Sequence, residues 1–435
     1  MRYRSTRSEA PTVLADAALR AGVAPDGGLY MPEQLPRFSV ADFSETPDLP
    51  GLAAKLLAPF FADTPVQTAM ADICADAFNF PCPRVRPDAR EDAPDILELF
   101  HGPTGAFKDF GARFLFRAFG ALGQTSDRPA TVLVATSGDT GGAVGCAAEG
   151  VAGTRAVILF PAGRISAFQE HQLCCWQAPV EAARIEGDFD ACQALVKTAF
   201  ADPELSRAHN LTSANSISIG RFLPQMTYWA RAALDVYAET GEPPGLIIPT
   251  GNLGNAFAAV LARTCGLPIG PIVLATNANT TLADWFRSGR YEGRPSIATL
   301  ANAMDVGAPS NFERLAALED SQIESVVSVD DKHIKTRMKT VFDETGYIAC
   351  PHTATALEAF ERLDPDPRQS RRWIVGATAH PGKFADIVEA VIGQPVDLPA
   401  TLRAVLERPV RCHDIAPDKA ALANLLGGKA HDRVD

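Results

Sequence analysis

Short apolar runs recur from residue 95 onward, and each is followed by a glycine- or proline-containing turn and then by a helical pattern. The runs are Ile96–Phe100, Thr131–Ala135, Ala156–Phe160, Val180–Ile185, Leu246–Pro249, Ile272–Ala275 and Trp373–Val375. The helical patterns include Phe110–Gly120, Phe189–Phe200, Phe222–Ala238, Asn255–Thr264, Lys332–Glu344 and Ala385–Val391. Strands rich in Val, Ile and Leu that alternate with helices predict parallel sheets covered on both faces. We therefore expect an α/β fold, with ligands bound where strands lead into helices.

Residues 1–92 follow a different pattern. Connectors that contain proline and glycine separate short helical patterns at Gly51–Ala58 and Thr68–Cys74, and the proline-rich stretch Pro81–Pro87 ends the segment. This alternation predicts a mostly helical N-terminal domain.

Two glycine-rich turns each lie between a predicted strand and a predicted helix. The first is Thr136–Gly142 and the second is Thr250–Asn255. Such turns present free backbone N–H groups at the positive end of a helix dipole, which suits a phosphate or a carboxylate. Neither turn matches G-x-x-x-x-G-K-[ST] or a full G-x-G-x-x-G with a downstream acid, which weakens the NTPase and dinucleotide interpretations. Glycines that only make tight turns remain the alternative for each turn alone.

Lys108 lies in a third turn between a predicted strand and a predicted helix. The chain has 9 Lys and 31 Arg, and Lys108 is the only lysine between Lys55 and Lys197. Because arginine could supply a cation alone, a lysine flanked by Phe107 and Phe110 favours chemistry that needs a primary amine, such as an imine with a carbonyl compound. Partial burial would lower the pKa of that amine. A surface lysine at a helix start is the alternative.

Two further segments carry polar groups that could bind a ligand. Asn215–Arg221 combines an amide, hydroxyls and a guanidinium, which can hold a second phosphate or carboxylate. Asn215 and Ser216 also suit an ordinary helix cap. Thr378 follows the last predicted strand and could offer a hydroxyl to a ring nitrogen or simply form a turn.

Composition narrows the classes of partner. The chain has 52 acidic and 40 basic residues, a net charge of −12, which argues against nucleic acid or an anionic membrane as the main partner. No apolar run approaches the ~20 residues that span a bilayer, and no apolar segment follows the basic start as in a secretory signal. Nine scattered cysteines without C-x-x-C predict neither a disulfide framework nor a metal site, and they fit a reducing cytoplasm. We disfavour a Cys350–His352 nucleophile, because nothing in the sequence orients the pair.

Taken in order, these segments resemble the threonine synthases, pyridoxal-phosphate enzymes of the tryptophan-synthase-β fold group. Tyr3–Arg7 and Asp26–Tyr30 are similar to that family's N-terminal region. The segments that resemble its core are His101–Asp109, Ala135–Gly142, Asn215–Arg221, Pro249–Asn255, Met304–Arg314 and Ala377–Phe384. Any one segment would be weak evidence, whereas the joint match covers most of the chain.

The resemblance implies pyridoxal-phosphate fold type II, with two open, mainly parallel sheet domains besides the helical N-terminal domain. The expected division is residues 1–92 for the N-terminal domain, 105–212 for the smaller α/β domain, and 93–104 with 213–435 for the larger, cofactor-binding domain. The implied reaction converts O-phospho-L-homoserine and water to L-threonine and phosphate by γ-elimination and β-addition of water. That reaction is the last step of threonine biosynthesis.

The resemblance also assigns roles to single residues. Lys108 would carry pyridoxal phosphate as a Schiff base and act as the catalytic base. Thr378 would face the pyridine nitrogen, where a neutral hydroxyl leaves the ring less electron-withdrawing than a carboxylate would. The cofactor phosphate would be bound by Gly251, Asn252, Leu253, Gly254 and Asn255. The substrate would be bound by Thr104, Ser137, Thr140, Asn215, Ser216 and Arg221.

Asp139 departs from the pattern of the wider fold group, in which Asn usually stands near the cofactor's phenolic oxygen. Asp is familiar in the longer threonine synthases, which this chain resembles. We expect Asp139 to lie in the cofactor site. Two negative groups repel unless one is protonated, so the sequence leaves its contact with the phenolic oxygen open.

Three rival functions remain at this stage. A related lyase would keep Lys108 and the Gly251–Asn255 turn and act on another phosphorylated or hydroxylated amino acid. A cofactor- or phosphate-sensing protein would bind without turnover. A nicotinamide oxidoreductase is disfavoured, because the dinucleotide fingerprint is incomplete. In every case we expect a small-molecule ligand, no nucleic acid, no membrane, and a monomer or homodimer.

Overall fold

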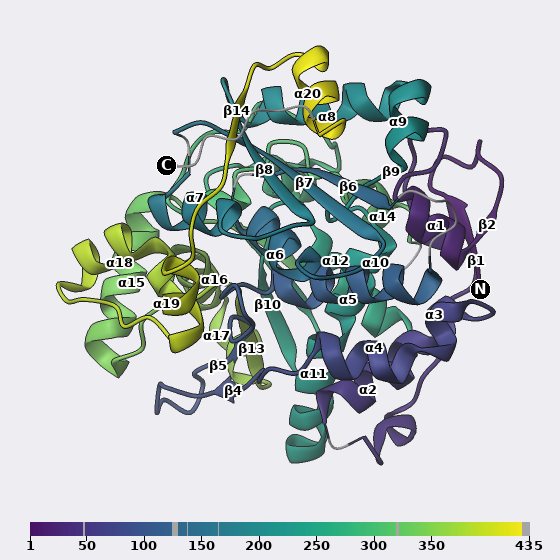
Figure 1. The fold of residues 1–435 in the computed structure, drawn as a ribbon. Coiled ribbons are helices and arrows are strands. Elements are labelled where there is room, and N and C mark those ends of the chain that lie inside the picture. Colours follow the sequence, from purple (N-terminus) through teal and green to yellow (C-terminus); the bar gives the residue numbers. More distant parts are fainter. Residues whose placement is uncertain (47, 124–128, 137, 164, 319–321, 429–435) are drawn as a thin grey trace.

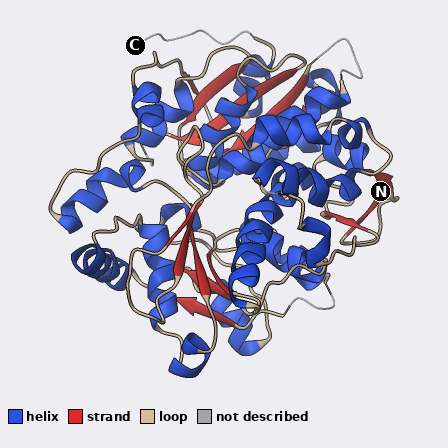
Figure 2. Ribbon diagram, turned by 90° about the horizontal axis from the view of Figure 1, so that it is seen from below, coloured by secondary structure: helices blue, strands red, loops and turns tan. Residues whose placement is uncertain are grey.

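The computed structural model describes residues 1–435 except 47, 124–128, 137, 164, 319–321 and 429–435. Its strands form one three-stranded, one six-stranded and one five-stranded sheet. Figure 2 shows the two larger groups of strands apart from each other, with helices around each. The α/β fold with mainly parallel sheets that the sequence predicted is confirmed.

The N-terminal part is mostly helical, as predicted, but it begins with an antiparallel sheet in the order β2-β1-β3 that the sequence analysis missed. In α2, Asp48 caps the first turn by accepting from the Gly51 N–H, and Leu52 and Leu56 are buried. The elements are β1 (Arg2–Ser5), β2 (Val13–Leu14), α1 (Ala15–Ala21), β3 (Tyr30–Pro32), η1 (Val40–Phe43), α2 (Leu49–Leu57), η2 (Ala58–Phe61), α3 (Pro65–Thr68) and α4 (Met70–Ala77).

The six-stranded sheet has the order β12-β11-β10-β13-β5-β4 and is parallel except for β4. Its strands are β4 (Arg84–Val85), β5 (Asp95–Glu98), β10 (Gly245–Pro249), β11 (Ile272–Thr276), β12 (Ser325–Ser328) and β13 (Trp373–Ala377). Every residue of β10, β11 and β13 is buried, because helices cover both faces. This burial explains why these strands appear in the sequence as unbroken apolar runs.

The helices of this part lie on opposite faces of the six-stranded sheet. Leu246 and Ile248 pack in the same cluster as α11 and α12, whereas Ile247 and Val375 pack with α15 and α16. The helical elements are α10 (Ile219–Phe222), η3 (Leu223–Gln225), α11 (Met226–Thr240), α12 (Gly254–Thr264), α13 (Thr281–Ser288), η4 (Asn302–Met304), α14 (Phe312–Ala316), α15 (Asp331–Thr345), α16 (Pro351–Glu361), α17 (Pro365–Gln369), η5 (Pro381–Phe384), α18 (Ala385–Ile392) and α19 (Ala400–Leu406).

The five-stranded sheet is parallel throughout, in the order β14-β8-β7-β6-β9. Its strands are β6 (Ala130–Ala135), β7 (Thr154–Pro161), β8 (Val180–Ile185), β9 (Leu211–Thr212) and β14 (His413–Ile415). The helices of this part are α5 (Lys108–Leu122), α6 (Asp139–Ala148), α7 (Ala167–Cys174), α8 (Phe189–Ala201), α9 (Pro203–His209) and α20 (Lys419–Leu426). In Figure 1, α5 and α6 lie between the two larger sheets.

The C-terminal segment differs from the predicted division of the chain, which placed all of 213–435 in the larger domain. Strand β14 pairs in parallel with β8. Leu422 and Leu425 of α20 pack in the same apolar cluster as Val157 of β7. The segment therefore lies with the smaller sheet, because its apolar side chains cover a face that would otherwise be exposed.

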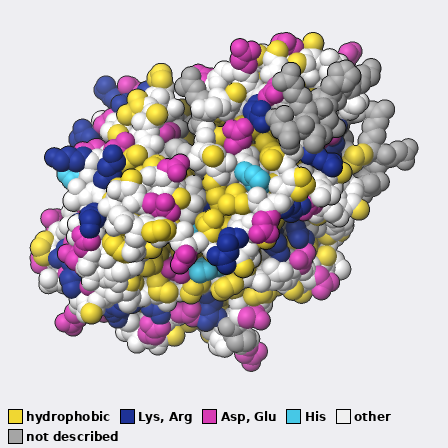
Figure 3. All heavy atoms as spheres, turned by 60° about the vertical axis from the view of Figure 1, so that its left-hand side comes forward, with side chains coloured by type: hydrophobic (Ala, Val, Ile, Leu, Met, Phe, Trp, Pro, Cys, Tyr) yellow, Lys and Arg dark blue, Asp and Glu magenta, His cyan; other side chains and the backbone are white. Residues whose placement is uncertain are grey.

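The surface and the helix lengths add two observations. On the face in Figure 3, Lys and Arg side chains lie among Asp and Glu, so both signs of charge are interspersed there. Of the helices that the structure describes, none has both the length and the apolar composition to cross a bilayer.

Candidate active site

Turns from both larger sheets meet around Lys108, the first residue of α5. The Phe107 N–H donates to the Thr378 carbonyl (2.9 Å), and the His380 N–H donates to the Gly105 carbonyl (2.9 Å), so the turns after β5 and β13 are joined. From the other sheet, Thr140 of α6 accepts a hydrogen bond from the Lys108 Nζ at 3.2 Å. The amine thus lies where the two sheets face each other, at the carboxyl ends of parallel strands.

The Lys108 amine is partly buried and sits close to other charges. Burial, followed by the positive charge of Arg221, lowers its pKa from 10.5 to about 8, while Asp139 acts in the opposite direction. The neutral form of the amine is therefore more accessible near neutral pH than in an exposed lysine. A neutral primary amine is a nucleophile and a base, so the surface-lysine alternative does not describe this position.

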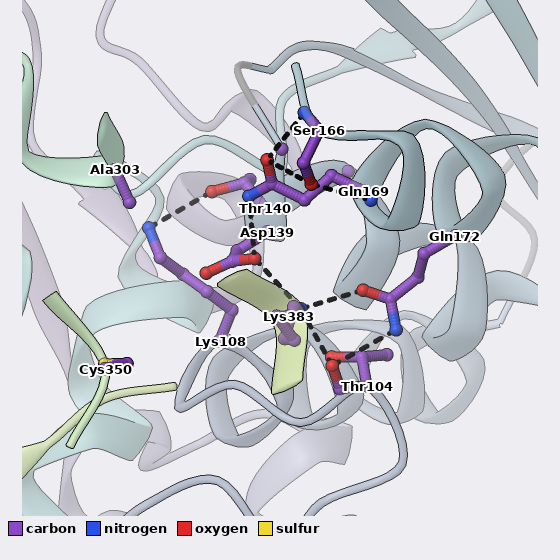
Figure 4. A network of polar contacts seen from close by, with 12 residues as sticks. Thr104, Lys108, Asp139, Thr140, Ser166, Gln169, Gln172, Ala303, Cys350 and Lys383 are labelled. Atoms are coloured by element: carbon purple, nitrogen blue, oxygen red, sulfur yellow. Dashed lines mark hydrogen bonds and ion pairs between the residues drawn. The ribbon is translucent and has the colours of Figure 1, made fainter. Parts of the chain in front are cut away.

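Asp139 is the centre of a buried polar network beside Lys108 (Figure 4). Its Oδ1 forms an ion pair with the Nζ of Lys383 at 2.9 Å and accepts from the Gln169 Nε2 at 3.3 Å. Burial by itself would raise the pKa of Asp139, yet the charge and hydrogen bond of Lys383 hold that pKa below its usual value. The Asp139 carboxylate is therefore ionised at neutral pH, with Lys383 as its counter-ion.

Lys383 uses all three of its N–H donors inside the protein. Besides Asp139, its Nζ donates to the Thr104 carbonyl and to the Gln172 Oε1, each at 2.8 Å. The Lys383 side chain is completely buried. Thr104 in turn donates its N–H and its hydroxyl to the Asp109 carboxylate at 2.9 and 2.8 Å.

The turn Thr250–Asn255 leads from β10 into α12 and leaves no room for a side chain at Gly251. A Cβ on Gly251 would lie 2.8 Å from the Cα of Met304. Leu253 has a left-handed φ of 63°, and the first turn of α12 contains no acidic residue. Asn252 donates to the Ser216 Oγ at 2.6 Å, which joins this turn to the segment Asn215–Arg221.

Asn255 leaves one donor free in this turn. Its Oδ1 accepts from the Tyr228 hydroxyl (2.7 Å) and from the Trp229 Nε1 (2.8 Å), which fixes the orientation of the amide. Its Nδ2 is buried and has no hydrogen-bond partner among the described residues. A buried unpaired donor at a helix N-terminus suits an anion.

Arg221 also keeps a free donor. It is completely buried, one Nη donates to the Ala214 carbonyl, and its Nε lacks a partner within the described part of the chain. Burial lowers its pKa to about 10, so the guanidinium stays charged. A Cβ on Gly111 would lie 2.5 Å from the Arg221 carbonyl oxygen, so the glycine lets α5 pack directly on this residue.

The structure therefore brings together most of the predicted site residues. Lys108 contacts Thr140, Asn252 contacts Ser216, and Thr378 is bonded through its carbonyl to Phe107. The Asn215 carbonyl accepts from the Ser218 N–H at 3.0 Å, which shapes the loop before Arg221. Thr104 lies in the same network through its carbonyl, which accepts from Lys383, but its hydroxyl is engaged with Asp109. Ser137 lies outside the described residues.

Lys383, Gln169 and Gln172 were not predicted from the sequence. Lys383 stands in a segment that was singled out, and the scarcity of lysine that drew attention to Lys108 applies to it equally. No local pattern marks Gln169 and Gln172, because they reach Asp139 and Lys383 only through the packing of α7 on α6 and on η5.

Cys350 and His352 do lie close to each other, with Sγ and Nδ1 3.9 Å apart. Burial raises the pKa of the Cys350 thiol, and burial lowers the pKa of His352 to about 4. The His352 Nε2 accepts from the Ala303 N–H at 3.1 Å. A protonated thiol beside a neutral imidazole is not an activated nucleophile.

Comparison with known families extends this picture. Residues 97–378 match the family described as "Pyridoxal-phosphate dependent enzyme". Residues 2–78 match "Threonine synthase N terminus", and residues 353–426 match "Threonine synthase, C-terminal".

Individual proteins are similar over nearly the whole chain. Threonine synthase of Escherichia coli K12 is 39% identical over 417 residues, which cover 94% of this chain and 95% of that protein. The structure of PLP-bound threonine synthase from Brucella melitensis has a TM-score of 0.90 at 33% identity and covers 99% of this chain and 100% of that one. Maize serine racemase, at 19% identity and a TM-score of 0.54 over 72% of this chain and 92% of that one, shares the fold alone.

Proposed function

The chain belongs to the threonine synthase family of pyridoxal-phosphate-dependent enzymes, and we propose that Lys108 is the residue that holds the cofactor and acts as the base. As a carbon–oxygen lyase acting on phosphate, it converts O-phospho-L-homoserine and water to L-threonine and phosphate. The observation that carries the residue assignment is the partly buried Lys108 amine, with its pKa lowered to about 8, between the two sheets.

The residues present fit pyridoxal phosphate. Its aldehyde requires a primary amine, which Lys108 supplies. Its phosphate requires an anion site without a carboxylate of its own, and the turn Thr250–Asn255 offers the Asn255 Nδ2 and the start of α12. We assign Gly251, Asn252, Leu253, Gly254 and Asn255 to the phosphate, and Thr378 to the ring nitrogen.

When bound, pyridoxal phosphate supplies an electron sink conjugated to the amino group of the substrate. Lys108 Nζ then takes the proton from the substrate Cα, which its lowered pKa allows near neutral pH. Thr140, whose Oγ1 lies 3.2 Å from that nitrogen, orients it.

The substrate's anionic groups are assigned to the segment before α10. The charged Arg221 guanidinium, close enough to lower the pKa of Lys108, supports this role, because a guanidinium binds phosphate or carboxylate. Asn215, Ser216, Thr140 and Ser137 complete the assignment. For Thr104 we propose a supporting role, since its hydroxyl holds Asp109 one residue after Lys108.

The organisation of the protein is also a proposal. We assign residues 1–92 to an N-terminal domain and 105–212 to the smaller α/β domain. Residues 93–104 and 213–435 form the larger α/β domain, except that the C-terminal segment from β14 onward is assigned to the smaller α/β domain. Sheet membership supports this division.

The nine free cysteines support a cytoplasmic location for the protein. We expect a monomer or homodimer that binds neither nucleic acid nor membrane.

Replacing Lys108 by alanine tests the residue assignment. The variant should lose turnover by more than ~1000-fold, because it lacks both the attachment point and the base. Phosphate and threonine release from phosphohomoserine is measured, with serine and threonine as alternative substrates to separate the related-lyase rival. Borohydride reduction followed by peptide mapping should fix the cofactor on Lys108 in the unmodified protein.

The exposed Lys197 provides the matched control, and Lys197→Ala should behave like the unmodified protein. A reduced adduct on another residue, or near-normal turnover of Lys108→Ala, would overturn the assignment.

A further inference from the structure

We propose that Lys383 is a positioning residue for the reaction: through its ion pair with Asp139 it holds three turns together around the Lys108 amine and balances the charge there. The inference rests on the proposed role of Lys108. It concerns a residue that the sequence analysis left without a role.

The geometry places Lys383 at the junction of three turns. It lies on η5, which follows Thr378, and its Nζ reaches the carbonyl of Thr104 before α5 and the carboxylate of Asp139 at the start of α6. Gln172 of α7 takes the third hydrogen bond. Because Nζ is completely buried and fully bonded, small shifts of any of these turns would cost one of its hydrogen bonds (Figure 4).

The packing around this network is tight on the other side of Asp139 as well. Gly138 has a φ of 143°, and a Cβ there would lie 2.4 Å from the Gln169 Nε2, which bonds to Asp139. The carboxylate is thus held from two sides, by Gln169 and by Lys383. A buried carboxylate held in this way has a fixed position and a fixed charge.

The ion pair also explains how a carboxylate fits in a site for an anionic cofactor. The sequence left open how Asp139 avoids repulsion with a second negative group. Lys383 supplies the compensating charge, so the pair as a whole is neutral. Without Lys383, an uncompensated buried carboxylate would remain beside the amine.

Three charged groups from the surrounding elements act on the Lys108 amine, and a fourth titratable group, His352, interacts with it. Asp139 raises its pKa, whereas Arg221 and Lys383 lower it. His352 is neutral above pH 4 or so, because burial lowers its pKa to about 4. Removing Lys383 should therefore raise the pKa of Lys108, and removing the charge of Asp139 should lower it. A purely structural role would not produce shifts of opposite sign.

The test uses the apoenzyme, so that it does not depend on cofactor chemistry. The rate at which trinitrobenzenesulfonate labels Lys108 is followed against pH by peptide mapping. In Lys383→Met the pH midpoint of the labelling rate should rise by about 1 pH unit. At a pH below the midpoint, this corresponds to a roughly tenfold lower labelling rate. In Asp139→Asn the midpoint should fall. The double variant Lys383→Met/Asp139→Asn should return close to the unmodified protein.

Lys55→Met removes an exposed lysine and is the matched control, with no expected change in the midpoint. A folded Lys383→Met variant with an unchanged midpoint, or two single variants that shift in the same direction, would overturn the proposal. If Lys383→Met does not fold, the double variant decides. In it the midpoint should lie above that of Asp139→Asn, because the uncompensated Lys383 cation is gone, and equal midpoints in these two variants refute the role of Lys383.

A failure of this proposal is distinguishable from a failure of the proposed function. The labelling measures only charges around Lys108 in the absence of cofactor. The borohydride adduct tests whether Lys108 holds the cofactor, and it is measured on the unmodified protein.

Discussion

The two glycine-rich turns look alike in the sequence, yet the structure uses them differently. In the turn before α6, Asp139 occupies the first helical position and is neutralised by Lys383. In the turn before α12, no acidic residue is present and the Asn255 Nδ2 is without a partner among the described residues. One helix start therefore carries an internal anion, and the other remains available for an external one.

The side chain at the first helical position thus decides whether the helix N-terminus itself is left for an external anion: at α6 Asp139 takes that place, and at α12 it stays open. The backbone geometry of the two turns follows from similar sequences. The occupant follows from one side chain at the start of the helix and from a lysine more than 200 residues away in the chain.

The largest effect is expected from placing a carboxylate in the turn Thr250–Asn255 before α12, here called the open turn. Asn255→Asp should weaken cofactor binding by about 100-fold or more, because it replaces the free Nδ2 donor with a negative charge facing a phosphate. Cofactor affinity is measured by absorbance titration of the apoenzyme. Asn424→Asp, on the exposed side of α20, is the control and should leave affinity unchanged. Equal affinities in both variants would mean that the turn does not bind the phosphate.

The next largest effect is expected in the turn before α6, where Asp139 is paired with Lys383. Asp139→Asn leaves Lys383 as a buried cation without its carboxylate, so the free energy of unfolding should fall by about 3 kcal/mol. Urea denaturation of the apoenzyme measures this change. The exposed pair Lys339–Asp343 provides the control, and Asp343→Asn should cost less than about 0.5 kcal/mol. Similar losses in the two variants would show that burial of the Asp139 pair has no energetic consequence.

A smaller effect should follow from adding a methyl group to the open turn. Gly251→Ala places a Cβ 2.8 Å from the Cα of Met304, so the backbone must shift and cofactor affinity should drop about tenfold. Gly120→Ala has nothing within 4 Å of its new Cβ and serves as the control. The same titration compares them, and an unaltered affinity in Gly251→Ala would contradict the close approach seen here.

The smallest effect is expected outside both turns. Cys350→Ala should change kcat and KM by less than about twofold, because burial keeps the thiol protonated and no step uses it. Steady-state kinetics with phosphohomoserine provide the measurement, and cofactor content confirms folding. A loss of several orders of magnitude would revive the Cys–His nucleophile.

Much of the fold was predictable from apolar runs. Val180–Ile185 was predicted with its observed bounds, and Thr131–Ala135 and Ile272–Ala275 each miss one residue at one end. The strands at Ala130–Ala135 and Ile272–Thr276 are almost wholly buried and their sequences are nearly all apolar, whereas Val180–Ile185 carries Glu181 and Arg184 at partly buried positions. The strands that were missed, such as Ser325–Ser328 and His413–Ile415, are only partly buried or very short, and they lack that signal.

The residues of the candidate site were predictable where a single turn contains the reactive or ligand-binding group within its own sequence. Lys108, the turn Gly251–Asn255 and Arg221 stand next to glycines or helix starts that point to amine and anion chemistry. Gln169, Gln172 and Lys383 were not predictable in this way. Their roles depend on contacts between α7, η5 and α6, which no local pattern records.

The α/β fold, the strand-to-helix turns and the primary amine at Lys108 depend on residues close together in the chain, so they can be recognised without coordinates. Which turn keeps a free donor and which contains its own ion pair depends on the folded arrangement. Burial and charge compensation come from groups brought together from distant segments, and these groups set the pKa of Lys108 and the charge of Asp139.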